Sequence, residues 1–80
     1  MIRLFNIIMN DNQISCDYEP EHSGKSGHLS VSLLTQEVSN YRFSDYEYGK
    51  NFYLSHAYAK ILDLINTGNQ IPREAYSICF

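Results

Sequence analysis

The chain has 80 residues, a formal net charge of −3 and only six Lys and Arg residues, which are scattered along it. Nucleic-acid binding through phosphates needs basic side chains gathered on one face, so this composition argues against it. No apolar run reaches the roughly 18 residues of a membrane span, and the N-terminus lacks the pattern of a signal peptide. We therefore expect a single domain, residues 1–80, that is cytoplasmic and contacts neither membrane nor nucleic acid.

The first half of the chain is expected to form two β-hairpins. Apolar and polar residues alternate in stretches that turn-forming residues separate, as in half-buried strands. The expected strands are residues 2–9, 14–19, 28–34 and 38–43. The first is apolar at both odd and even positions, which is typical of a strand covered on both faces. In the fourth, the alternation changes near Ser39 and Asn40, which indicates a β-bulge.

The second half is expected to contain one helix. Ser44 and Glu47 have the spacing of a capping box, so the helix is predicted to begin at Ser44. Its buried face is defined by helical spacing. That face comprises Leu54, Ala57, Tyr58, Ile61, Leu62 and Ile65. Gly68 is typical of a helix end, and residues 76–80 alternate as a closing strand.

This order, β-β-β-β-α-β, predicts an α+β fold: a mostly antiparallel sheet of four to five strands with one helix packed on one face. A single helix covers only one face of the sheet. Because the first strand is apolar on both faces, we expect a protein partner, or a second copy of the chain, to cover the other.

Residues 21–31, EHSGKSGHLSV, contain the end of the phosphate-binding pattern G-x-x-x-x-G-K-[ST]. The pattern requires a glycine where this chain has Glu19, and Pro20 then removes an amide donor. It also requires a helix next, whereas the following residues alternate as a strand. The stretch is therefore interpreted as an exposed loop and not as a nucleotide site.

The acidic and histidine side chains near this loop match no known metal-ligand spacing. His22 has Asp17, Glu19 and Glu21 as neighbours, but loops of this composition are usually solvated. The three carboxylates share one parity of the second strand, so we interpret them as a solubilising edge that resists strand addition. No catalytic residue, cofactor or metal is predicted.

Aromatic side chains on the predicted helix are the best candidates for an interface. Tyr48 and Phe52 are spaced i, i+4 and fall on the polar side, where aromatic residues are typical of interface anchors. His56 also lies opposite the buried face, so the candidate interface is Tyr48, Phe52 and His56. Cys16 and Cys79 lie in apolar patterns and are interpreted as small buried hydrophobes.

Three parts of the sequence, taken together, resemble a group of short uncharacterised bacterial proteins of unknown function. They are DYEP at residues 17–20, SDYEYG at residues 44–49, and Tyr53 with the pair His56-Ala57. The resemblance implies no activity; it implies only a free-standing bacterial cytoplasmic protein.

The function favoured by the sequence is a small, non-catalytic protein-binding module that self-associates as a homodimer. The alternative is a small ligand-binding or enzymatic module that uses His56 or His22 with nearby carboxylates. That alternative predicts that these groups converge in one pocket. An acidic decoy for a nucleic-acid-binding protein is a third hypothesis, which the small net charge disfavours.

Overall fold

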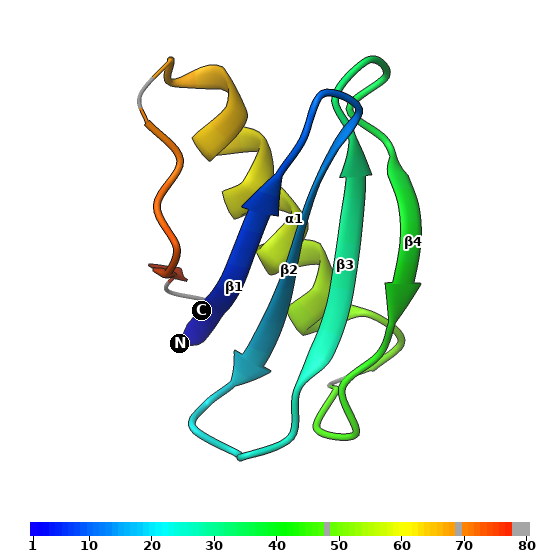
Figure 1. Ribbon diagram of the computed structural model, residues 1–80. Helices are drawn as coiled ribbons and strands as arrows, with labels where there is room; N and C mark the ends of the chain where they lie inside the picture. The colour runs from blue at the N-terminus through cyan, green and yellow to red at the C-terminus, as the bar shows by residue number, and fades with distance from the viewer. Residues whose placement is uncertain (48, 69, 78–80) are drawn as a thin grey trace.

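A computed structural model describes residues 1–47, 49–68 and 70–77. Within them lies one antiparallel sheet with one helix on one face, so the predicted α+β fold is confirmed (Figure 1). The elements are β1 (Ile2–Met9), β2 (Gln13–Pro20), β3 (Gly27–Ser32), β4 (Val38–Arg42), α1 (Phe52–Asn66) and β5 (Ala75–Ser77). The sheet order is β4-β3-β2-β1-β5, which makes β4 and β5 its two edges. Residues 78–80 of the predicted closing strand lie outside the described residues.

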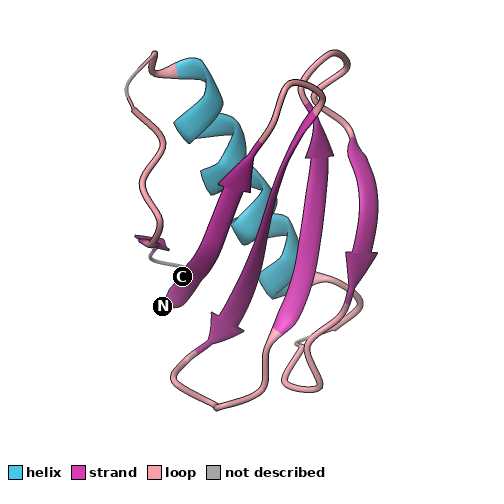
Figure 2. Ribbon diagram, viewed as in Figure 1, coloured by secondary structure: helices cyan, strands magenta, loops and turns pink. Residues whose placement is uncertain are grey.

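The hydrophobic core lies between α1 and one face of the sheet. Helix α1 runs obliquely across the sheet and packs against β1, β2, β3 and β5 (Figure 2). Its buried residues are Leu54, Ala57 and Ile61, as the helical spacing predicted. The strands contribute Ile2, Leu4, Ile7, Ile14, Cys16, Tyr18, Leu29 and Val31. These residues form a two-layer core that one helix closes from one side only.

Helix α1 begins at Phe52, so the predicted start at Ser44 is wrong. The Ser44 hydroxyl does accept a backbone hydrogen bond, from the amide of Tyr46 at 3.0 Å, but the bond closes a turn. The amide of Glu47 bonds the carbonyl of Ser44 in the same turn, at 3.2 Å. Side-chain-to-backbone bonds of this kind stabilise turns as well as helix starts, so the spacing alone did not fix the boundary.

Glu47 nevertheless caps α1 from outside the helix. Its carboxylate accepts hydrogen bonds from the amides of Tyr53 and Leu54 in the first turn of the helix. The second carboxylate oxygen accepts from the hydroxyl of Tyr18 at 2.7 Å, and burial raises the pKa of that phenol, which stays protonated. Tyr18 thereby joins the centre of the sheet to the start of the helix.

A β-bulge in β1 explains why this strand is apolar at both parities. Between Phe5 and Ile8 the pairing with β2 shifts by one residue, and Asn6 adopts a left-handed backbone with φ of 53°. Beyond the bulge, alternation moves by one position, so that Ile7 is 6% exposed and Ile8 is 64% exposed. The interpretation of β1 as apolar on both faces is confirmed, because Ile7 faces α1 whereas Phe5 and Ile8 lie on the opposite face.

The predicted bulge in β4 is confirmed. Ser30 pairs with Asn40 and Val31 pairs with Val38, which leaves Ser39 as the extra residue. The bulge places Val38 and Tyr41, three residues apart, on the same side of the sheet, because Tyr41 pairs with the buried Leu29.

Candidate functional site

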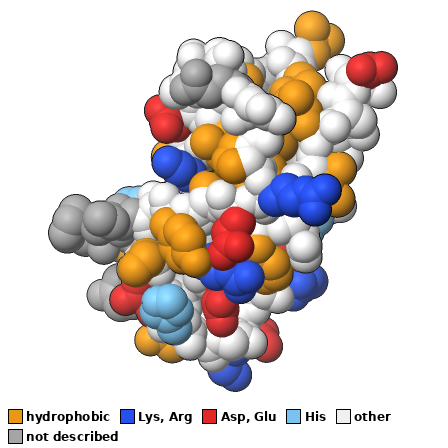
Figure 3. Space-filling view, turned by 60° about the vertical axis from the view of Figure 1, so that its left-hand side comes forward, with side chains coloured by type: hydrophobic (Ala, Val, Ile, Leu, Met, Phe, Trp, Pro, Cys, Tyr) orange, Lys and Arg blue, Asp and Glu red, His pale blue; other side chains and the backbone are white. Residues whose placement is uncertain are grey.

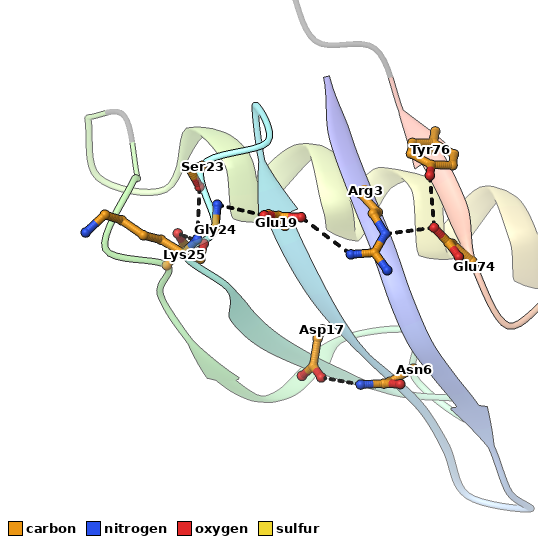
Figure 4. Close-up of polar contacts among 10 residues, drawn as sticks. Arg3, Asn6, Asp17, Glu19, Ser23, Gly24, Lys25, Glu74 and Tyr76 are labelled. Carbon is orange, nitrogen blue, oxygen red and sulfur yellow. Dashed lines mark hydrogen bonds and ion pairs between the residues drawn. The ribbon is translucent and has the colours of Figure 1, made fainter.

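The sheet face opposite α1 carries two rows of hydrogen-bonded polar side chains, and the first row runs across β2 and β1 to β5 (Figure 4). The Arg3 guanidinium donates to Glu19 at 3.4 Å and to Glu74 at 2.7 Å. Tyr76 donates to the same Glu74 carboxylate at 2.9 Å. Arg3 also stacks on the ring of Phe5, 4.3 Å from its centroid. The row therefore pairs these charges with one another and covers the apolar ring.

The second row crosses β1, β2 and β3. Asn6 donates to one Asp17 oxygen at 3.0 Å, and the other lies 2.9 Å from His28 Nδ1. His28 Nε2 lies 3.3 Å from the hydroxyl of Ser30. Burial opposes ionisation of Asp17, but the hydrogen bonds from Asn6 and His28 and the charge of Arg42 outweigh it and lower the pKa of Asp17.

The order Asp17, His28, Ser30 is that of a nucleophile activated through a histidine, but its setting differs from a hydrolase site. Ser30 is 4% exposed. It also lies on β3, whose amide groups bond to β2 and β4 within the sheet and are not presented to an oxyanion. The row thus organises the polar face, and its geometry does not supply acyl-transfer chemistry.

A cavity of about 480 Å³ opens beside this row, where β1 and the residues leading to β5 separate. Its walls include Asn6 and Ile8 from β1 and Arg73 from the segment before β5. The amide of Ile7 bonds the carbonyl of Arg73 at 3.2 Å and closes one end of the gap. Arg3, Phe5 and Glu74 of the first row line it as well, so its walls combine apolar, cationic and anionic groups, and Asn6 connects it to the second row.

The two histidines that the sequence suggested as functional, His22 and His56, lie in different parts of the fold and do not share a site. His22 has a left-handed backbone in the loop after β2 and is exposed, whereas His56 lies on α1, half-buried, with its ring 4.7 Å from that of Phe52. Among the described residues, no group of three or more metal-ligating side chains occurs. The histidine that does meet a carboxylate is His28, which sequence reasoning missed because its contact with Asp17 depends on the β2–β3 register.

The carboxylates of β2 do not protect a sheet edge, so that interpretation was wrong. β2 lies at the centre of the sheet, between β1 and β3. Asp17 and Glu19 take part in the two rows, and Glu21 pairs with the N-terminal amine of Met1. Glu19 also accepts from the amide of Gly24 at 2.7 Å. The amide of Gly24, which a phosphate-binding loop would donate to a phosphate, is therefore already hydrogen-bonded to a carboxylate. Strand β3 follows the loop, as predicted.

The aromatic residues named as interface candidates lie near the start of α1. Tyr48 is outside the described residues. Phe52 is half-buried, and its ring centroid lies 5.0 Å from that of Tyr53 in an edge-on arrangement and close to His56. These rings pack on one another, so the structure places Phe52 and His56 within a local aromatic group.

Exposed apolar and aromatic side chains also lie on edge strand β4 and just beyond it. All five residues of β4 are exposed, with Val38 at 36% and Tyr41 at 53%. Just beyond the strand, Phe43 is 42% exposed and its ring centroid lies 5.0 Å from that of Tyr41. We call Val38, Tyr41 and Phe43 the β4 edge surface. Helix α1 packs against the other strands and leaves it largely uncovered, as Figure 1 shows.

The charged side chains form no extended surface of one sign on the side of the molecule drawn in Figure 3, where acidic and basic groups intermingle.

Cys16 is buried, as predicted, and burial together with the charge of Asp17 raises the pKa of its thiol to about 12. Cys79 lies outside the described residues. At 15 residues, α1 is too short to cross a membrane, and the described residues contain no longer helix.

Comparisons with protein-family models, with curated proteins and with solved structures find no match to this chain. The functional argument therefore rests on the geometry of the β4 edge surface and of the polar face.

Proposed function

We propose that this protein is a small, non-catalytic protein-binding module that self-associates, and that it binds through the free edge of β4. The observation that carries the proposal is that all five residues of β4 are exposed, Tyr41 among them, with the exposed ring of Phe43 next to the strand. On the rest of the sheet, α1 covers one face, and the other face carries the two rows of bonded polar side chains, the exposed Ile8 and the cavity beside it.

An exposed edge strand offers unpaired backbone N–H and C=O groups to a further strand. Of the features by which proteins avoid this pairing, β4 (VSNYR) has no Lys or Pro, although it contains a bulge and ends in Arg42. The opposite edge differs, because in β5, over the described residues Ala75–Ser77, the side chain of Tyr76 is engaged in the first polar row. The two edges are thus unequal, and β4 is the one suited to strand addition.

The β4 edge surface adds side-chain contacts to the backbone pairing. Tyr41 and Phe43 supply large apolar area and lose little conformational freedom when they bind, which is why aromatic residues anchor many interfaces. Both rings lie where a strand added to β4 would place its own side chains. The binding of a second chain would therefore bury them on the α1 side of an extended sheet.

Sedimentation equilibrium over a range of concentrations tests the proposal. We expect a mass approaching twice the 9.3 kDa of the chain. Tyr41→Asp places a charge in the proposed contact and should give a monomer. Tyr76→Asp is the matched control, since Tyr76 is 50% exposed at the other edge, and it should still associate. A wild-type chain that stays monomeric at the highest soluble concentration would refute self-association.

A second candidate function is the binding of a small organic anion in the cavity beside Asn6. The cavity supports it, because Arg73 supplies a cation and Ile8 an apolar wall, and the Glu74 carboxylate that also lines the cavity is paired with Arg3. Benzoate is a suitable probe, since it carries a carboxylate and an apolar ring. Titration followed by NMR should give saturable shifts at Asn6 and Arg73, reduced in Arg73→Ala. Shifts that grow linearly with benzoate and spread over the whole chain would exclude this site.

A further inference from the structure

The bulge in β4 gives its free edge an unusual pattern of side chains. In an uninterrupted strand, residues three positions apart point to opposite faces. Because Ser39 is an extra residue, Val38 and Tyr41 both face the α1 side, where they pair with the buried Val31 and Leu29. The two apolar members of β4 therefore lie on one face, on either side of the bulge.

Two charged residues at the ends of β4, Glu37 just before the strand and Arg42 as its last residue, lie together on the opposite face. Arg42 pairs with His28, whose ring belongs to the polar face. Glu37 precedes Val38, so alternation turns it to that face as well. The amide of Ser32 bonds the carbonyl of Glu37 at 2.9 Å, which continues the ladder of β3 and β4 to this residue. Glu37 and Arg42 thus carry opposite charges on one face, at the two ends of the strand.

These positions make the edge complementary to itself. If two copies of β4 lie antiparallel with the two bulges opposite each other, Tyr41 of one copy meets Val38 of the other, and Arg42 meets Glu37. The twofold axis repeats both contacts, as in any isologous interface. Aromatic with β-branched pairs and oppositely charged pairs are the cross-strand contacts that stabilise antiparallel sheets.

We propose that the partner bound at the β4 edge is a second copy of this chain, paired antiparallel in this register, so that the two sheets become continuous. The inference rests on the proposed function and specifies its partner and geometry. The faces match in this arrangement, so both helices lie on one side of the joined sheet. In the single chain the Arg42 side chain donates to the carbonyl of Ser26, beside the start of β3, at 3.0 Å, so the proposed pairing requires it to turn towards the free edge.

Two charge-reversal variants test the register. In Glu37→Arg, arginine meets arginine twice across the interface, and in Arg42→Glu, glutamate meets glutamate twice. Each variant alone should self-associate at least about tenfold more weakly than the wild type, since like charges directly opposite destabilise paired strands. An equimolar mixture of the two should associate as a heterodimer near wild-type strength, because both contacts then join opposite charges. Sedimentation measures all three samples, and circular dichroism confirms that each variant is folded.

The outcomes separate this inference from the proposed function. If wild type associates and Tyr41→Asp abolishes the dimer, but the mixture gains nothing over the single variants, the register is overturned while binding at β4 stands. A monomeric wild type overturns both. A further variant, Val38→Cys with Tyr41→Cys in a Cys79→Ser background, does not depend on charge. Oxidation should link it into covalent dimers, and a failure to cross-link under conditions where the protein associates would contradict the register.

Discussion

The two faces of the sheet are built from the same strands but are stabilised in different ways. Towards α1, alternate side chains are apolar and buried; on the other face, most are polar and bonded in two rows, with Phe5 and Ile8 as apolar members. The comparison shows that a sheet face without a covering layer is tolerated when its polar groups satisfy one another. Exposed apolar side chains also lie on the α1 side of β4, where Val38 is 36% and Tyr41 53% exposed.

The largest effect on stability is expected at Ile7, one of two adjacent isoleucines at the β1 bulge. Ile7→Ala removes a side chain that is 6% exposed and should lower the free energy of unfolding by about 2–4 kcal/mol, since it leaves a cavity under α1. Ile8→Ala, at a residue that is 64% exposed, should change it by less than about 0.5 kcal/mol. Urea denaturation compares the two, and a larger loss at Ile8 would mean that β1 continues without a bulge.

Gly27→Ala should be the next most damaging change. A Cβ there would collide with the ring of Tyr18 and lie 2.6 Å from the backbone carbonyl of Arg42, so a destabilisation of up to about 3 kcal/mol is expected. Gly24→Ala is the control: its φ is 74° but nothing lies within 4 Å, so only the backbone cost of about 1 kcal/mol applies. Equal thermal stabilities of the two variants would contradict the close packing of Tyr18 against β3.

Tyr18→Phe tests the connection between the core face and the start of α1. The change leaves the Glu47 carboxylate and the amide of Ser44 without a shared partner and should cost about 1–2 kcal/mol. Tyr76→Phe removes an exposed hydroxyl on the polar face and should cost less than about 0.5 kcal/mol. Chemical denaturation of both, with helix content followed at 222 nm, distinguishes them; indistinguishable values would remove the special role of Tyr18.

The smallest effect concerns pH and the second polar row. The pKa of Asp17 lies below its ordinary value of 3.8 in the folded chain. A lowered folded pKa stabilises the protein above the unfolded value, and this contribution is lost as pH falls through the folded pKa. Stability should therefore decline below about pH 4, and Asp17→Asn should make that decline shallower. If the slopes of the two proteins coincide in acid, Asp17 is not held as the structure shows.

Local alternation in the sequence was enough to predict the strands, the buried side of α1 and the β4 bulge. It did not predict the bulge in β1, because the adjacent isoleucines Ile7 and Ile8 hide the position where the alternation shifts. It failed at Ser44, because the bonds of a capping box also form in a turn. The contact of Asp17 with His28 needs the register between two strands, and the exposure of Tyr41 depends on the path of α1 across the sheet. Neither the contact nor the exposure can be predicted from one segment of the chain alone.

Amide hydrogen exchange at two protein concentrations tests the central claim most directly. If β4 pairs with a second copy, amide hydrogens of Val38–Arg42 that point away from β3 should exchange more slowly as concentration rises and the dimer forms. Exchange in Ala75–Ser77, at the opposite edge, should not change. Exchange in β4 that is independent of concentration, while the mass rises to that of a dimer, would contradict the assignment of β4 as the binding edge.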